Sequence, residues 1–452
     1  MNHASITFHG GAGTVTGANF LFDTGDTKIL IDCGALEREH VCDESNAMPF
    51  AYNPADIDVL FVSHAHADHI GRVPRLVNQG FKGIIYSTAA TRDLAALMFD
   101  DALNVMRIDA QKHGCSILYE KDDVERTLSL WQTHEYHEHF HVGEAQVELL
   151  DAGHILGSSM IKLTRGERSI IFTGDLGNSP EPLLNDTESP EGVNYIVMES
   201  VYGDRLHEHR DERANILRDA IEHTRTQGGV LLIPSFSIER TQILLFEMEK
   251  MIEGGMKPID VYLDAPLAIR VTEVFRKYPK LLNADVQTHM EGGNDPFIFK
   301  KLHVIHDVAE SRKIHEAADP KIIVAGAGMS VGGRIRAHES KYLPDPKATV
   351  LFVGYQAPGS LGRRIQEGQK NISIDGEQVT VRAAIGGLTG YSGHRDRDGL
   401  LEFADNAGPS LEKVFVVMGE PKAELFISQR IHDFIGVEAH VPAAGEKVEI
   451  NW

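Results

Sequence analysis

Residues 58–69 read DVLFVSHAHADH, a short apolar run followed by three histidines and an aspartate. The apolar run is typical of a buried β-strand. The polar side chains that follow its carboxyl end can converge on one point, and they are His64, His66, Asp68 and His69. Imidazole nitrogen and carboxylate oxygen are the ligands that zinc takes at catalytic sites. The stretch therefore predicts a metal site rather than a solvated polar loop.

Two later residues extend this pattern. His154 lies in DAGHILGSS, residues 151–159, and Asp175 lies in IIFTGDLG, residues 170–177; each follows an expected strand and has a glycine nearby. Alone, such a residue is more often a hydrogen-bonded structural group. Together with the first stretch, the two residues predict adjacent sites, one held by His64, His66 and His154 and one by Asp68 and His69, with Asp175 bridging them. A pair of metal ions can clamp a phosphate and lower the pKa of bound water, so the nucleophile would come from solvent.

The order of strand-like and helix-like segments predicts an α/β protein with two domains. Up to residue 175, short β-rich runs are separated by glycine, with helices expected over 91–112 and 121–132. After Tyr195, strands alternate with helices, among them 238–252 and 267–278, which is the signature of a parallel sheet. Short strands then return, with helices near Asp398 and Lys422.

The length of the chain also favours two domains. A single core rarely grows beyond about 300 residues, and this chain has 452. We expect a first domain over 1–208, an inserted domain over 209–358, and a return segment over 359–452 that completes the first domain.

The composition, 42% apolar and 24% charged, is that of an ordinary globular protein. Residues 1–10 lack a basic flank followed by an apolar run, and no apolar stretch is long enough to span a bilayer, so we expect a cytoplasmic protein with no membrane partner. Cys33, Cys42 and Cys115 show no CxxC spacing and are expected to be inert thiols. The net charge of −22 argues against a protein that coats nucleic acid by releasing counterions, so any RNA-binding surface must be local.

Several ordered motifs resemble a known family. HAHADH at 64–69, with His154 and Asp175, resembles the ligand set of the metallo-β-lactamase superfamily. MESVYGDRLH at 198–207 resembles the acidic motif of the β-CASP nucleases, the family of bacterial ribonuclease J and of the endonuclease that cleaves pre-mRNA 3′ ends. The further matches are IPSFSIERTQ, VYLDAPLA, GAGMSVGGR, GYQAPGSLGRR and GYSGHRDRDGL. The resemblance covers nearly the whole chain and is closest to the compact prokaryotic members without extra RNA-binding domains.

The resemblance implies a fold and an activity. The fold is an αββα metallo-β-lactamase sandwich with an inserted β-CASP domain, a parallel sheet flanked by helices. The activity is zinc-dependent hydrolysis of RNA phosphodiester bonds, with one or two zinc ions per chain, and we expect an endonuclease with an exonuclease as the near alternative. By analogy with the family, His394 donates a proton to the leaving oxygen, Glu199 orients its imidazole, and Asp68 orients the attacking water. On local sequence alone, His394 would be a cap before the helix near Asp398.

One position departs from the family pattern. The third motif of the family reads VHGE, with the histidine on the second zinc, whereas residues 417–420 here read VMGE. The thioether of Met418 is a poor zinc ligand compared with imidazole. Three explanations stay open: one tightly bound zinc, a second ion completed by water, or a protein with reduced or absent turnover.

Two segments are candidates for binding single-stranded RNA: the first lies in the expected insertion, and the second, GSLGRR at 359–364, directly follows its expected end. In GAGMSVGG, residues 326–333, backbone N–H groups before a helix could cradle a phosphate. The residues predicted to bind substrate in these two segments are Ser330, Gly332, Arg334, Ser360 and Arg363. A glycine-rich turn that packs a strand on a helix, and arginines on a solvated face, are the alternatives.

Competing interpretations remain. Alternating histidines at 134–141 could chelate a surface ion, but an exposed polar strand is favoured.

The same metal centre would also serve a hydrolase of small-molecule esters or thioesters, although such an enzyme needs neither the large insertion nor the pair Glu199 and His394. A catalytically weakened RNA-binding homologue is the third possibility, and a homodimer is compatible with all three. Manganese or iron could replace zinc.

Overall fold

The computed structural model describes residues 3–36, 44–114, 116–207, 212–354, 356 and 359–452. The chain divides into two compact units: unit 1 comprises Met1–Leu206 and Gly393–Trp452, and unit 2 comprises His207–Ser392. Across the described ranges, no helix combines the length and the apolar character that crossing a membrane requires.

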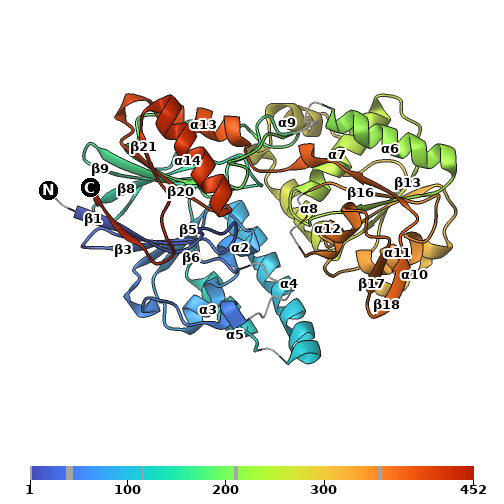
Figure 1. Ribbon diagram of the computed structural model, residues 1–452, viewed down its shortest axis with the longest axis horizontal. Coiled ribbons are helices and arrows are strands. Elements are labelled where there is room, and N and C mark those ends of the chain that lie inside the picture. Colours follow the sequence, from blue (N-terminus) through green and yellow to red (C-terminus); the bar gives the residue numbers. More distant parts are fainter. Residues whose placement is uncertain (1–2, 37–43, 115, 208–211, 355, 357–358) are drawn as a thin grey trace. The chain divides into compact units, whose positions relative to one another are not determined.

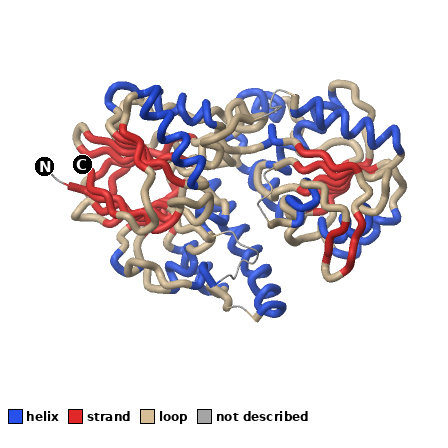
Figure 2. The backbone as a smooth tube through the Cα atoms, in the orientation of Figure 1, coloured by secondary structure: helices blue, strands red, loops and turns tan. Residues whose placement is uncertain are grey.

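Unit 1 is built on two seven-stranded sheets, which Figure 2 shows as two layers of strands. The first sheet has the order β22 (Lys447–Asn451), β1 (His3–Gly10), β2 (Asn19–Asp23), β3 (Lys28–Ile31), β4 (Val59–Phe61), β5 (Ile84–Ser87) and β6 (Trp131–Thr133). The second has the order β21 (Glu438–His440), β20 (Lys413–Val417), β11 (Tyr195–Glu199), β10 (Arg168–Phe172), β9 (Ser159–Arg165), β8 (Ala145–Asp151) and β7 (Phe140–Val142).

The core of unit 1 lies between the two sheets. Phe8, Phe22 and Phe61 of the first sheet pack with Phe172 and Phe415 of the second, all almost fully buried. Burying such side chains contributes roughly 1.5–3 kcal/mol each. The two inner faces therefore hold the sandwich together.

Helices cover the outer faces of both sheets (Figure 1). Near the first sheet lie α1 (Glu44–Ala47), α2 (Ala67–Ile70), α3 (Val73–Asn78), α4 (Ala89–His113) and α5 (Lys121–Ser129). On the second sheet, α13 (Arg397–Asp405) and α14 (Pro421–Ile435) bury Leu400, Phe403, Ile427 and Ile431 against the strands. These four layers confirm the predicted αββα sandwich.

Unit 2 contains a six-stranded sheet in which every pairing is parallel. Its order is β14 (Leu302–Val304), β13 (Asp260–Asp264), β15 (Lys321–Ala325), β12 (Val230–Pro234), β16 (Thr349–Phe352) and β19 (Ala384–Gly387). The helices are α6 (Arg213–Gln227), α7 (Arg240–Glu253), α8 (Pro266–Lys277), α9 (Ala284–Glu291), α10 (Val308–Lys313), α11 (Ile335–Tyr342) and α12 (Leu361–Gln366), and a hairpin is formed by β17 (Asn371–Ile374) and β18 (Glu377–Thr380). The parallel sheet confirms the predicted class of the insertion.

The inserted unit ends at Ser392, whereas the sequence analysis expected it to end at residue 358. Residues 359–392 belong to unit 2, because β19 pairs with β16 and the hairpin buries Ile372 and Val379 in the core of that unit. These contacts join segments distant in sequence, so the local pattern did not reveal them.

Two local predictions were wrong. The helix expected over 121–132 ends at Ser129, because Trp131 pairs with β5 as a buried strand residue and its Nε1 donates to Ser87 Oγ over 2.8 Å. The polar strand expected over 134–141 is mostly a turn, in which His137 has a φ of 63° and the ring of His134 stacks on Phe140 at 3.7 Å. Within this stretch, only Phe140 and His141 belong to a strand, β7 (Phe140–Val142).

Candidate metal centre

The metal-ligand stretch lies where β4 ends and α2 begins. Strand β4 is completely buried, and the chain then turns so that His66 precedes the first residue of α2. Gly34 makes this turn possible, since a Cβ at that position would lie 1.6 Å from the backbone oxygen of Asp68. The loop therefore packs closely against the residues that follow β3, and His64 and His69 are completely buried.

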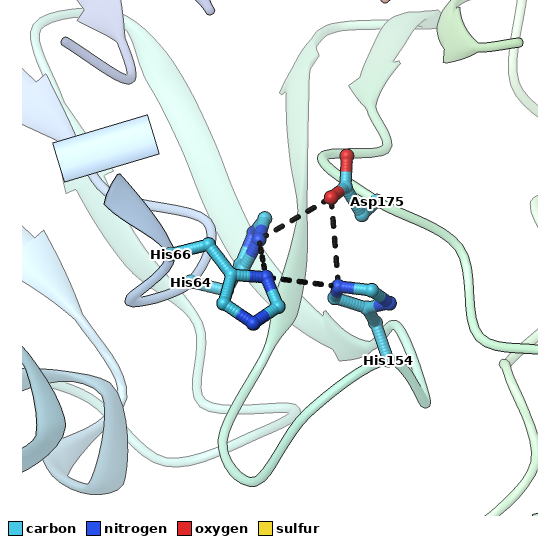
Figure 3. Close-up of side chains that lie close together, drawn as sticks. All are labelled: His64, His66, His154 and Asp175. Carbon is cyan, nitrogen blue, oxygen red and sulfur yellow. Dashed lines mark hydrogen bonds and ion pairs between the residues drawn. The ribbon is translucent and has the colours of Figure 1, made fainter. Parts of the chain in front are cut away.

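Four side chains from three loops form a compact cage (Figure 3). His66 Nδ1 lies 3.1 Å from His64 Nε2 and 3.2 Å from His154 Nε2. Asp175 Oδ2 lies 3.4 Å from His64 Nε2 and 3.5 Å from His154 Nε2. Ligand atoms about 2.1 Å from a tetrahedral ion lie about 3.4 Å apart, so these separations match a single zinc-sized ion.

A second group shares Asp175. The other oxygen of this residue, Oδ1, lies 3.2 Å from His69 Nε2, which is 3.7 Å from Asp68 Oδ2. Both Oδ1 of Asp175 and Nε2 of His69 are buried without a hydrogen-bond partner. Buried polar atoms are normally satisfied, and a cation between these atoms would satisfy both. Asp175 thus faces both groups, one with each oxygen.

The ring orientations agree with a ligand role. His69 Nδ1 is 2.7 Å from Asp32 Oδ2, and His154 Nδ1 is 2.9 Å from the backbone oxygen of Gly393. A proton held on each Nδ1 leaves the lone pair on Nε2 facing the centre, as in metal-binding histidines generally. Ser63 reinforces the arrangement, because its hydroxyl donates to Asp32 over 2.7 Å.

The electrostatics favour neutral imidazoles at His64, His66 and His154 and an ionised carboxylate at Asp175; at His69 burial is outweighed by Asp175 and Asp32, which raise its pKa well above the usual value. Burial holds the pKa of His66 and of His154 well below the usual value, and that of His64 below it. For Asp175, burial is outweighed by His69 and His64, so its pKa lies well below the usual range. The neutral imidazoles of His64, His66 and His154 and the ionised Asp175 are the protonation states that bind a divalent ion.

Glu199 and His394 lie beside this centre. Glu199 is completely buried at the end of β11 and accepts hydrogen bonds from the N–H groups of Leu176 and Val201. His394 Nδ1 lies 3.2 Å from Glu199 Oε1 and 3.8 Å from Asp175 Oδ2. Burial opposes a charged imidazole, yet Glu199 and Asp175 together raise the pKa of His394 to about 9. Glu199 therefore contacts the imidazole that it is predicted to orient, and the protonated form of His394 is favoured.

Met418 occupies the position after β20. It is 2% exposed, has a φ of 52°, and its N–H donates to the backbone oxygen of Gly11 over 2.6 Å. Its side chain belongs to the core between the sheets. Among the described residues, the second group therefore gathers only Asp68, His69 and Asp175 as potential ligands.

The five residues predicted to bind substrate all lie in unit 2, away from this centre in sequence, and four of them have internal partners. The Ser330 hydroxyl donates to Glu339, and Arg334 Nη1 lies 2.6 Å from Asp264 Oδ1. Ser360 caps α12 by accepting from the N–H of Arg363, whose side chain pairs with Glu367. Gly332 is half-buried in the turn before α11.

The sequence analysis missed Asp32. This residue follows β3 in KILIDCG and orients His69, so the rule that selected Asp175, a carboxylate at a strand end beside glycine, could have found it. Cys33 is buried and free, and burial raises the pKa of its thiol to about 12, in keeping with an inert role. Cys42 and Cys115 lie outside the described residues.

Comparison with known proteins places these observations in a family. The profile of the metallo-beta-lactamase superfamily matches residues 12–235, that of the Beta-Casp domain matches 241–365, and that of the Zn-dependent metallo-hydrolase RNA specificity domain matches 378–442. The chain is 33% identical over 442 residues to "Ribonuclease TTHA0252" of Thermus thermophilus, covering 98% of this chain and 99% of that protein.

Other relatives are longer. The chain is 30% identical to "Transcription termination factor FttA" of Methanosarcina mazei, over 98% of this chain and 71% of that protein, and 31% identical to the FttA of Methanocaldococcus jannaschii, over 99% and 72%. Among solved structures, a protein of unknown function from Enterococcus faecalis aligns with a TM-score of 0.59 at 14% identity, covering 99% of this chain and all of that one. That likeness concerns the fold alone.

Proposed function

Because the chain belongs to the β-CASP branch of the metallo-β-lactamase superfamily, we propose that it is a zinc-dependent ribonuclease that cleaves within single-stranded RNA. The observation that carries the proposal is the juxtaposition, in one unit, of the four-atom cage with the pair formed by Glu199 and His394. The cage fits one zinc ion, and the pair supplies the proton donor that a leaving oxygen needs.

Each side chain has a defined task in this proposal. When bound, a divalent ion at His64, His66, His154 and Asp175 neutralises phosphate charge and activates water. Asp68 orients the attacking water from the edge of the cage. Glu199 holds His394 through Nδ1, and we assign Nε2 as the nitrogen that protonates the leaving oxygen.

RNA is favoured over small esters and thioesters for two reasons. Hydrolysis of small molecules does not need a histidine acid that is oriented by a buried carboxylate, whereas Glu199 contacts His394 in this chain. The match to an RNA specificity domain and to a protein named as a ribonuclease points the same way. Residues Ser330, Gly332, Arg334, Ser360 and Arg363 remain our candidates for contacting the RNA backbone. The cytoplasmic location and the homodimer stay predictions.

A cleavage assay on circular single-stranded RNA tests the proposal, because a circle offers no end to an exonuclease. We expect the full-length protein to linearise the circle, and a chelator or the substitution His66→Ala to abolish this by removing the ion. His141→Ala, which changes an exposed histidine of the same unit, is the matched control and should cleave normally.

The outcomes separate the candidate functions. Cleavage of linear RNA alone would replace the endonuclease with an exonuclease. Hydrolysis of thioesters without cleavage of any RNA would favour the small-molecule hydrolase. Full activity of the chelated protein and of His66→Ala would remove the metal from the reaction.

A further inference from the structure

A second cluster of potential ligands lies in unit 2, remote in sequence from every residue of the hydrolytic centre. Glu249 and Glu253 occupy the last turn of α7, and His289 lies on α9. One ligand atom from each of the three side chains lies within 4.8 Å of the others. Residues four apart project from the same face of a helix, so α7 presents both carboxylates to the imidazole of α9.

The burial of Glu249 requires an explanation. Glu247 and Glu249 are 8% and 7% exposed, but their surroundings differ. Glu247 is compensated by Arg213, 3.2 Å away, and by the hydroxyl of Tyr391. Glu249 Oε2 and His289 Nε2 are instead buried without hydrogen-bond partners. A buried carboxylate without compensation is costly, and it is normally paired or bound to a metal.

The distance from His289 Nε2 to Glu249 Oε1 is compatible with an ion between these two atoms. His289 Nε2 lies 3.4 Å from Glu249 Oε1, and its Nδ1 lies 3.9 Å from Glu253 Oε1. The first separation equals the edge of about 3.4 Å expected between two ligands of a tetrahedral ion. The second involves the other ring nitrogen and is too long for a hydrogen bond, so only the common reach of 4.8 Å relates Glu253 to the same ion.

The charges around the cluster also favour a cation. Burial, and then the neighbouring Glu253 carboxylate, raise the pKa of Glu249 to about 7. Asp295 adds negative charge, although its own carboxylate is held by Arg276 at 2.6 Å. Lys250 pairs with Glu253 at 3.7 Å, with both side chains nearly half exposed, so this contact is weak and does not reach the buried end of the cluster.

We propose that Glu249, Glu253 and His289 bind a divalent transition-metal ion that clamps α9 to the end of α7. One imidazole and two carboxylates suit Zn²⁺, whereas an imidazole is a poor ligand for Mg²⁺ or Ca²⁺. Three protein ligands leave a fourth position for water. The role is structural, because nothing among the described neighbours resembles the acid pair beside the hydrolytic centre.

Zinc content of the full-length protein tests this inference. The probe is Zn²⁺ alone, added to chelator-stripped protein, followed by dialysis and elemental analysis. We expect His289→Ala and Glu253→Gln each to hold one ion per chain fewer than the parent. The matched controls are His223→Ala and Glu291→Gln, which change exposed residues of α6 and α9 and should leave the content unchanged.

The same comparison is repeated in a His66→Ala background, where the hydrolytic cage is disabled, and the difference of one ion should persist. Zn²⁺ should also raise the Tm of the parent more than that of His289→Ala. Glu253→Gln is an isosteric change at the more exposed ligand. If this variant holds as much zinc as the parent, the inference is overturned. RNA cleavage by His289→Ala should continue, so failure of this clamp is distinguishable from failure of the proposed function.

Discussion

His394 combines a buried carboxylate partner with a position beside the metal cage, and this predicts its contribution to turnover. Replacing it with alanine removes the proton donor, so we expect His394→Ala to slow RNA cleavage by roughly 100-fold or more. The measurement is the single-turnover rate on a labelled oligonucleotide at saturating protein.

The metal content separates a proton donor from a ligand. His394→Ala should retain the zinc content of the parent, and Glu199→Gln should lose rate while KM stays near the parental value, as expected for a residue that positions the imidazole. His432→Ala, at an exposed histidine of α14, is the control. A normal rate in His394→Ala would exclude the histidine from the reaction.

Met418 makes a second prediction at the scale of one residue. Its φ of 52° is in the left-handed region, which histidine adopts more readily than most residues. Met418→His should therefore fit the backbone and supply the imidazole that the second group lacks. We expect zinc content to rise toward two ions in the hydrolytic centre and RNA cleavage to increase.

Met418→Leu tests packing without adding a ligand. The leucine side chain should keep the apolar contacts that Met418 makes in the core. One of these contacts is with Gly11, where the Met418 sulfur lies 2.6 Å from the position that a Cβ would occupy. Unchanged zinc stoichiometry in Met418→His, measured by elemental analysis against this control, would contradict the prediction.

Among elements, α11 carries a buried acid that binds the turn before the helix, and its titration should affect stability. Glu339 is completely buried and accepts from the Ser330 hydroxyl; burial raises its pKa to about 8. The folded-state pKa lies above the usual value of 4.5. The protonated acid therefore stabilises the fold fully below pH 4.5, and this contribution is lost as the pH rises to 8.

Glu339→Gln keeps an acceptor for Ser330 and cannot ionise. Between pH 6 and pH 9 the parent should lose about 3 kcal/mol of unfolding free energy relative to this variant. Urea unfolding at the two pH values measures the difference, and Glu377→Gln, an exposed acid, is the control. A variant that parallels the parent at both values would show that Glu339 is ionised throughout.

The sequence predicted elements best where the pattern was local. The strand before His64, the helix α4 and the alternation of unit 2 follow from apolar periodicity and glycine boundaries. The end of α5 and the stretch 134–139 were predicted wrongly because pairing of Trp131 with β5 and stacking of His134 on Phe140 override local preference. The internal partners of Ser330 and Arg334 likewise depend on Glu339 and Asp264, which no local spacing connects.

For the whole molecule, the sequence predicted the architecture of the two domains but not the residue at which the insertion ends. Family resemblance gave the sandwich and the insertion, and strand-end histidines and carboxylates gave the cage. The boundary at residue 392 required knowledge of which sheet β19 joins, a contact between segments about 35 residues apart. The cluster of Glu249, Glu253 and His289 likewise depends on packing between α7 and α9.

The insertion of unit 2 between β11 and β20 sets the order in which the active centre can be completed. The cage residues are all translated before residue 176, but His394 and the strand that lies next to β11 follow the entire insertion. A nascent chain on the ribosome has its metal ligands long before it has its acid. With His394 in its proposed role, such a chain holds all the residues of the cage early but gains its proton donor only after the whole insertion has been synthesised.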